Sequence, residues 1–264
     1  MPLKIYAVKI DIVTLFYNFD TSMINFLRQA HRVWFLFWII FFFALLYPLY
    51  YLTSRNEKYY SALNFCRKLN SFLCSLFSGV IFIYTFEERL NNKQTYIYCA
   101  NHTSNLDIMV FCIMCSGRYH FMGKDELLKN PVLSIFFKTI DISVNRESKI
   151  SAFRAFKKAG ENLEKGMSLI IFPEGKIDDH YPPKLGEFKN GPFRLAIDKN
   201  IPLVPVSITN VWKINWDDGS KYGSKPGICD IYIHKPINTA ALAIDDADIL
   251  KEQVFHLIES KLIL

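Results

Sequence analysis

The sequence has few of the features that mark disulfide-rich or zinc-binding proteins. It contains six cysteines, and only the spacing of Cys112 and Cys115 (Cys-x-x-Cys) is typical of a metal or redox site. No second cysteine pair is present to complete a zinc site, and both residues lie in an apolar stretch. We therefore expect buried, reduced thiols, which indicates a reducing compartment such as the cytoplasm.

The sequence also lacks the usual signals for nucleic acid binding, secretion and metal binding. The net charge is +6, but there is no run of Lys and Arg and no RNA-binding aromatic signature. Lys4, Lys9 and Asp11 interrupt the start of the chain, so no signal peptide is expected. Residues 178–180 (Asp-Asp-His) have no partner at metal-ligand spacing, which favours a solvated loop and no metal site. A modest positive charge suits an anionic membrane surface or an anionic substrate.

Apolar residues are abundant and concentrated before residue 90. Residues 33–52 are twenty consecutive apolar residues, long enough as a helix to cross a hydrocarbon core of about 30 Å. Aromatic residues lie near both ends of this stretch, as in an interfacial belt, and basic residues flank both sides, so its orientation is left open. A buried soluble helix is the alternative. Residues 1–32 are mixed, and within them residues 1–17 fit a strand or an interfacial helix. Residues 60–86 predict a long, mainly apolar helix at the interface.

From residue 95 the chain alternates between short apolar runs and helical patterns. This alternation predicts an α/β fold with a mixed, largely parallel sheet flanked by helices. The last stretch, residues 245–262, has apolar residues at helical spacing and should close the fold as an amphipathic helix. The expected strands are residues 95–100, 119–123, 139–144, 167–172, 203–208 and 228–234, and the expected helices are residues 108–115, 125–138, 149–165 and 192–199.

A histidine and an aspartate lie where the first of these strands turns into a helix. His102 should sit on the turn, and Asp107 in the first helical turn. In that geometry the carboxylate can reach back to one imidazole nitrogen, leaving the other nitrogen as a general base. The alternative is that His102 only satisfies the turn and Asp107 only complements the helix dipole.

A glutamate follows a later apolar strand. The run Ser168-Leu-Ile-Ile-Phe leads directly into Pro173-Glu174-Gly175. Proline cannot continue a central strand and glycine permits a positive φ, so the strand should stop and turn there. Glu174 would then lie at the carboxyl edge of a parallel sheet, where open α/β folds bind ligands.

The two motifs together, Asn-His-x4-Asp and Phe-Pro-Glu-Gly, resemble the glycerolipid acyltransferase family. The chain is most similar to the lysophosphatidic acid (1-acylglycerol-3-phosphate) acyltransferases over about residues 80–260. The resemblance implies an N-terminal membrane-associated helical region, residues 1–87, that docks a catalytic domain, residues 88–264, on one leaflet. It also implies transfer of a fatty acyl group from acyl-CoA or acyl-carrier protein to a lysophospholipid hydroxyl, with no further cofactor.

The resemblance assigns roles to particular residues. His102 with Asp107 would be the general base, and Lys124 and Arg146 would hold the phosphate of the acceptor. Glu174 and Gly175 would line the acceptor pocket. Asn101, Thr103 and the N–H groups that begin the helix after His102 are candidates for stabilising the oxyanion.

Two positions depart from the family pattern, and three other functions stay open. Lys176 follows the Glu-Gly pair where the family usually has Thr or Ser, and Asn145 precedes Arg146 where an acidic residue is common. These changes bear on the acceptor, which could be glycerol 3-phosphate, a lyso-ornithine lipid or another lysophospholipid. A metal-dependent phosphoesterase with His102, Asp107 and Glu174 as ligands is a further alternative. The last is a membrane-anchored lipid-binding protein without enzymatic activity.

Overall fold

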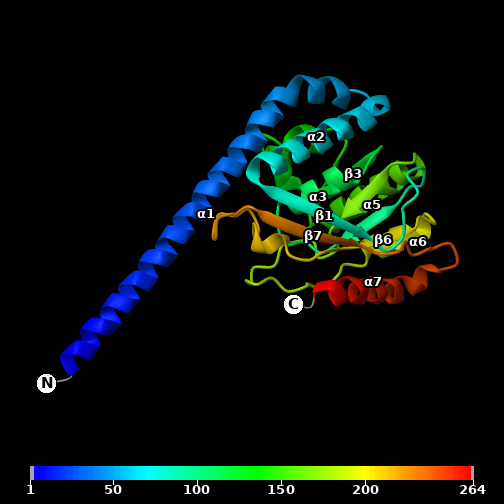
Figure 1. Ribbon diagram of the computed structural model, residues 1–264. Coiled ribbons are helices and arrows are strands. Elements are labelled where there is room, and N and C mark those ends of the chain that lie inside the picture. The colour runs from blue at the N-terminus through cyan, green and yellow to red at the C-terminus, as the bar shows by residue number, and fades with distance from the viewer. Residues whose placement is uncertain (1–2, 263–264) are drawn as a thin grey trace.

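The computed structural model describes the backbone of residues 3–262 and the side chains of residues 21–262. A seven-stranded sheet forms its centre, in the order β1-β7-β6-β2-β5-β3-β4 (Figure 1). Neighbouring strands are parallel except for β6 and β7, which are antiparallel, so the expected mixed, largely parallel sheet is confirmed. The strands are β1 (Val80–Phe86), β2 (Ile97–Ala100), β3 (Tyr119–Lys124), β4 (Ile142–Val144), β5 (Ser168–Ile171), β6 (Leu203–Ile208) and β7 (Gly227–Ile233).

Helices cover both faces of the sheet. One apolar cluster joins the sheet to α3 and to the inner sides of α1 and α2, and a second cluster joins it to α5, α6 and α7. Burial on both faces explains why β2 is a continuous apolar run, and β6 one apart from Ser207, instead of alternating strands. The α-helices are α1 (Leu3–Ser54), α2 (Tyr60–Ser78), α3 (Asp107–Met114), α4 (Ser134–Phe137), α5 (Lys149–Glu164), α6 (Gly191–Asp198) and α7 (Ala247–Leu262). The short 3-10 helices are η1 (Glu57–Tyr59), η2 (Asp125–Lys129), η3 (Val211–Lys213) and η4 (Ile244–Asp246).

Helix α1 contains the apolar segment and extends beyond the rest of the molecule toward the N-terminus (Figure 1). The first 32 residues are therefore helical from Leu3 onward. Among the described residues, Thr21–Ser54 is the one helical stretch long and apolar enough to cross a membrane. One side of this stretch packs on the domain, with buried Phe35, Phe42 and Phe43. The other side is exposed and available to lipid; it carries Trp34, Phe37, Ile40, Phe41 and Leu45.

The expected helix over residues 60–86 is wrong in its last part. Helix α2 ends at Ser78, and Gly79 has a φ of +68°, a left-handed conformation that glycine adopts without steric cost. The next seven residues form β1, whose β-branched and aromatic side chains favour a strand. Because β1 pairs in parallel with β7, the sheet begins before residue 88, where the catalytic domain was expected to start.

The expected helix over residues 125–138 is also wrong, because it is broken in the middle. Asn130 is extended, as is usual for a residue before proline, and separates η2 from α4. Its side-chain oxygen accepts hydrogen bonds from the N–H groups of Val132 and Leu133, at 2.9 and 3.0 Å. The Asn-Pro pair thus ends one short helix and starts the next.

A buried ion pair joins α2 to the sheet. The guanidinium of Arg67 donates to both carboxylate oxygens of Asp141, at 3.2 and 2.9 Å, and both side chains are buried. Asp141 also accepts the N–H of Phe121 in β3, at 2.9 Å. The guanidinium lies over the rings of Phe121 and Phe136, 4.9 and 4.7 Å from their centroids. This pair therefore fixes the N-terminal helices relative to the sheet.

Replacing Asp141 with Asn should lower the free energy of unfolding by about 3 kcal/mol, because Arg67 would stay buried without its counter-ion. The double change Arg67→Met with Asp141→Leu should recover much of that loss, since it leaves no unpaired charge. Denaturant titration of the full chain in detergent micelles measures both. Glu57→Gln, which breaks the exposed pair with Lys165, is the control and should cost less than about 1 kcal/mol. An equal loss of unfolding free energy in Asp141→Asn and Glu57→Gln would contradict the prediction.

Candidate active site

Four of the predicted site residues lie at the carboxyl ends of four neighbouring parallel strands. The strands β2, β5, β3 and β4 are adjacent in that order. His102 follows β2, Glu174 follows β5, Lys124 ends β3, and Arg146 follows β4. Because parallel strands end at a common edge, all four residues belong to the same edge of the sheet.

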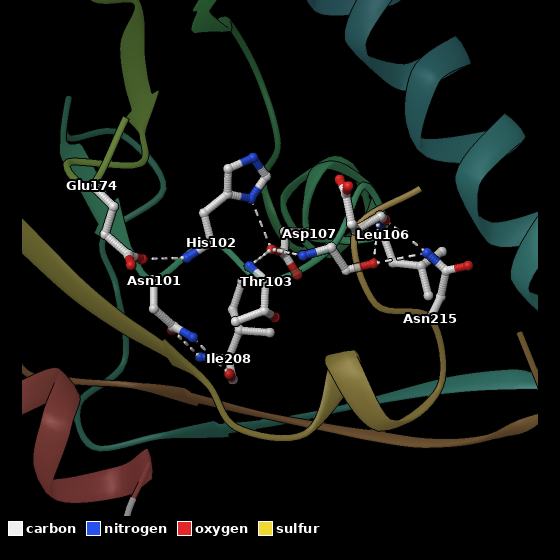
Figure 2. A network of polar contacts seen from close by, with 10 residues as sticks. Asn101, His102, Thr103, Leu106, Asp107, Glu174, Ile208 and Asn215 are labelled. Atoms are coloured by element: carbon white, nitrogen blue, oxygen red, sulfur yellow. Dashed lines mark hydrogen bonds and ion pairs between the residues drawn. The ribbon is translucent and has the colours of Figure 1, made fainter. Parts of the chain in front are cut away.

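His102 and Asp107 are in direct contact. The Nδ1 of His102 lies 2.9 Å from the Oδ2 of Asp107, which is fully buried (Figure 2). The same Oδ2 accepts the backbone N–H groups of Thr103 and Ser104, at 2.7 and 2.9 Å. A carboxylate accepts hydrogen bonds, so Nδ1 is the donor in this pair, and in the neutral imidazole Nε2 then keeps a free lone pair. The contact predicted between turn and helix is therefore present.

A phenylalanine from the neighbouring strand supports the imidazole. The ring of Phe172 stacks on that of His102, with centroids 4.1 Å apart and planes 15° from parallel. Phe172 directly precedes the Pro-Glu-Gly turn, at the end of the strand next to β2. Sequence reasoning missed this contact, although the pairing of the two strands would have indicated it.

Glu174 binds the backbone of the site. One carboxylate oxygen accepts the N–H of His102 and the other the N–H of Gly186, both at 2.7 Å. Burial raises the pKa of Glu174 to about 7, and these two hydrogen bonds only partly oppose the effect of burial. A Cβ at Gly186 would lie 2.9 Å from an oxygen of Glu174, so a side chain there would displace the carboxylate. The carboxylate therefore connects the turn at His102 to the loop that follows β5.

Gly175 shapes the turn after Glu174. Its φ is +78°, and a Cβ at this position would meet the Nζ of Lys189 at 3.0 Å. The N–H of Lys189 also donates to the carbonyl oxygen of Pro173, at 3.0 Å. Lys189 is thus held against this turn and adds a cation beside the site.

Lys124 and Arg146 come from the two strands furthest along this edge. Lys124 pairs in register with Val144, two residues before Arg146. Within the part of the chain whose side chains are described, neither cation has an ion-pair partner within 4 Å. The fold thus brings His102, Asp107 and Glu174 into one connected network, whereas Lys124 and Arg146 share its edge of the sheet without touching it.

Most of the expected oxyanion donors are engaged elsewhere. The side chain of Asn101 donates to the carbonyl oxygen of Ile208 and accepts its N–H, at 2.9 and 2.8 Å (Figure 2). The first N–H groups after His102 are bound to Asp107. Thr103 has a buried hydroxyl without a partner, but it lines a cavity of about 40 Å³ whose walls do not include His102. These groups therefore do not form an oxyanion hole in this conformation.

The contacts of Glu174 and Asp107 do not favour a role as metal ligands. In residues 21–262, no group of three or more His, Cys, Asp or Glu side chains is placed to hold a metal ion. Both oxygens of Glu174 and one of Asp107 accept protein N–H groups. The phosphoesterase hypothesis, which needed His102, Asp107 and Glu174 as ligands, gains no support from this geometry.

Comparison with known proteins gives consistent results. The family model described as Acyltransferase matches residues 82–209. A chloroplastic 1-acyl-sn-glycerol-3-phosphate acyltransferase of Brassica napus is 31% identical over 193 residues, which cover 69% of this chain and 54% of the relative. The enzyme of the same name from Haemophilus influenzae is 28% identical over 172 residues, 63% of this chain and 68% of the relative.

The fold is also shared with a solved structure. The crystal structure of the 1-acyl-sn-glycerophosphate acyltransferase PlsC from Thermotoga maritima matches with a TM-score of 0.74 and 20% identity, over 90% of this chain and 96% of that one. This chain spans about half the length of each of the first three curated relatives that it matches.

The raised pKa of Glu174 makes folding stability depend on pH. The folded chain keeps this proton between about pH 4.5 and pH 7, where the unfolded chain has lost it. Stability should therefore fall as the pH rises through this window, by up to about 3 kcal/mol. Glu174→Gln should remove this slope, and Glu187→Gln, an exposed change in the same loop, should keep it. Denaturant midpoints from pH 4.5 to 8 test this, and parallel curves for wild type and Glu174→Gln would contradict it.

Proposed function

Because this chain belongs to the acyltransferase family, we propose that it transfers a fatty acyl group from a thioester to the free hydroxyl of lysophosphatidic acid, giving phosphatidic acid. The donor is acyl-CoA or acyl-carrier protein. A thioester is already activated, so transfer is direct and needs no cofactor and no acyl-enzyme intermediate.

In this mechanism His102 is the general base. Its Nε2 takes the proton from the acceptor hydroxyl while the oxygen attacks the thioester carbonyl. The tetrahedral intermediate then collapses and expels the thiolate, which takes the proton back from Nε2. Asp107 keeps the Nδ1 proton in place and stabilises the imidazolium that forms between the two steps.

The observation that carries this proposal is the hydrogen bond between His102 and Asp107. It is 2.9 Å long, and its carboxylate is fully buried while the imidazole is partly exposed, at 16%. A pair that served only the turn would not need an accessible imidazole. Phe172 fixes the plane of the ring, and Glu174 fixes the backbone beneath it. The histidine is therefore supported on three sides and still accessible to a substrate.

Lys124 and Arg146 are the proposed ligands of the acceptor phosphate. Both are cations without an ion-pair partner among the side chains described, and they come from the ends of adjacent strands at the same edge as His102. Two such cations can bracket a phosphate, with Arg146 supplying paired donors. Glu174, whose oxygens accept backbone N–H groups, would act on the acceptor pocket through the turn that it holds, as would Gly175.

Membrane association is the proposed role of α1. One side of its apolar segment is covered by the domain and the other is exposed. This favours a helix that lies in one leaflet beside the domain over a helix that crosses the bilayer. The domain would face the cytoplasm. All six cysteines are free and buried, in keeping with a reducing compartment.

The experiment that tests this function is acyl transfer by the full chain in micelles, from acyl-CoA and from acyl-carrier protein in parallel. Lysophosphatidic acid should be the best acceptor, ahead of glycerol 3-phosphate, a lyso-ornithine lipid and a lysophospholipid with a larger headgroup. A higher rate with one of these others would change the acceptor but keep the reaction. If no acceptor is acylated by either donor, the function itself is wrong.

Replacing His102 with Ala should lower kcat at least a hundredfold, because the hydroxyl would lose its general base. The control is His180→Ala, which removes an exposed histidine paired with Asp178 and should leave kcat unchanged. Rates under saturating substrates, with melting temperatures for both variants, provide the measurement. A folded His102→Ala chain with more than a tenth of the wild-type rate would exclude this histidine as the base.

Replacing Arg146 with Ala should raise the KM for lysophosphatidic acid roughly tenfold or more and change kcat less, since a charge-assisted contact to the phosphate would be lost. Arg154→Ala removes an exposed arginine of α5 and is the matched control. Steady-state kinetics against acceptor concentration measure both. An unchanged KM in the Arg146 variant would remove this residue from the acceptor site.

A further inference from the structure

The loop between β6 and β7, residues 209–226, is long, contains η3, and contacts two different parts of the molecule. One part of the loop touches the catalytic turn, and another part touches α1 just before its apolar segment. We call this loop the strap.

The backbone of the strap pairs with the backbone of the catalytic turn. The N–H of Asp217 donates to the carbonyl oxygen of Thr103, and the N–H of Asn105 donates to the carbonyl oxygen of Asp217, both at 3.0 Å. Asp217 has a φ of +52°, a left-handed conformation that Asp adopts more often than most residues other than glycine. The strap therefore changes direction at the residue that pairs with the turn.

Asn215 adds a side-chain contact at the same place. Its side chain is almost fully buried, and its Nδ2 donates to the Oγ of Ser104 at 3.1 Å and to the carbonyl oxygen of Asp217 at 2.9 Å (Figure 2). The Oγ of Ser104 also accepts the N–H of Leu106, at 3.0 Å. Since the N–H of Ser104 is bound to Asp107, Asn215 acts on the catalytic carboxylate through one residue.

The other part of the strap is fixed to α1. The N–H of Ser224 donates to the carbonyl oxygen of Arg28 at 3.0 Å, and its Oγ lies 2.7 Å from the Nδ1 of His31. The Nε of Arg32 donates to the carbonyl oxygen of Asp218, at 3.1 Å. These residues of α1 directly precede the apolar segment that begins at residue 33.

The close approach of strap and helix requires glycine. Gly223 has a φ of +69°, and a Cβ there would lie 2.5 Å from the carbonyl carbon of Arg28 and 2.7 Å from its oxygen. The helix backbone cannot yield to such a contact, so any side chain at Gly223 would push the strap away from α1.

We propose that the strap is a positioning element for the proposed acyl transfer, and that it sets the placement of the His102–Asp107 turn according to the position of α1. Asn215 is its positioning residue at the turn, and Gly223 is its contact at the helix. In this arrangement a shift of the membrane helix reaches the general base through the β-bridge between Asn215 and Ser224, which joins the two contacts of the strap, and through no substrate contact.

Asn215→Ala tests the contact of the strap with the turn, and Gly223→Ala tests its contact with α1. Each should lower kcat on the order of tenfold to a hundredfold, because a small misplacement of the base is costly. The KM for the acceptor should stay within about twofold, since Lys124 and Arg146 are untouched. Each should also weaken the downfield proton resonance of the His102 Nδ1–H, observed by NMR on the full chain in micelles and assigned by its loss in His102→Gln.

Gly117→Ala is the matched control. Gly117 has a φ of +78°, close to that of Gly223, but a Cβ there would meet no atom within 4 Å. The Gly117→Ala variant should be less stable than wild type, but its kcat and its His102 resonance should be unchanged. Ser224→Ala, which removes only the contact with His31, gives a milder second test if Gly223→Ala does not fold.

Three results would overturn the proposal: a folded Gly223→Ala chain with wild-type kcat and resonance, the same for Asn215→Ala, or an equal loss in Gly117→Ala. The double variant of Asn215 and Gly223 should lose less than the sum of the single losses in ln kcat, because both act through one element. The NMR measurement needs no turnover. It therefore tests the strap even if the wild-type chain acylates none of the acceptors, which would contradict only the proposed function.

Discussion

The candidate site depends on one buried carboxylate. Asp107 is excluded from solvent, and its Oδ2 accepts three hydrogen bonds, from the imidazole of His102 and from the N–H groups of Thr103 and Ser104. A carboxylate without water needs such donors, and its place in the first turn of α3 adds the favourable end of the helix dipole. The same three bonds fold the turn and orient the base. Any change that removes one of these hydrogen bonds should therefore disturb both the fold of the turn and the orientation of the imidazole.

The sheet turns this local arrangement into a site. Because β2 and β5 are adjacent and parallel, the turn after one strand lies beside the turn after the other. Phe172 and Glu174 consequently meet His102 from a segment about 70 residues later in the chain. Both oxygens of the buried Glu174 accept backbone N–H groups, which offsets part of the cost of burying this carboxyl group beneath the His102 turn. Sequence analysis assigned Glu174 to the acceptor pocket. Its direct contact is with the backbone of His102, which it holds in place.

The sequence predicted the parts of this arrangement that depend on short stretches. The central strands, the turn at His102 and its contact with Asp107 follow from apolar runs bounded by polar or Gly and Pro residues. It failed where one pattern fits two structures: residues 80–86 are apolar and β-branched, and only pairing with β7 makes them a strand. It also failed where partners are far apart. Asn215 lies 111 residues from Ser104, and nothing in either segment indicates the other.

The apolar core links Asp107 to α1. One packed cluster contains Phe35 and Phe42 of α1 together with Leu106 and Met109, which flank Asp107 in the sequence. The helix whose outer side is apolar and exposed thus shares, on its inner side, one apolar cluster with the start of α3. A lysophospholipid in a bilayer carries its hydroxyl beside its phosphate, at the level of the headgroups. A base fixed relative to an interfacial helix can meet that hydroxyl while the acyl chain stays in the leaflet, so the lipid need not be extracted for proton transfer. In the proposed function, this shared apolar cluster is the physical link between α1 at the membrane surface and the carboxylate beside the general base.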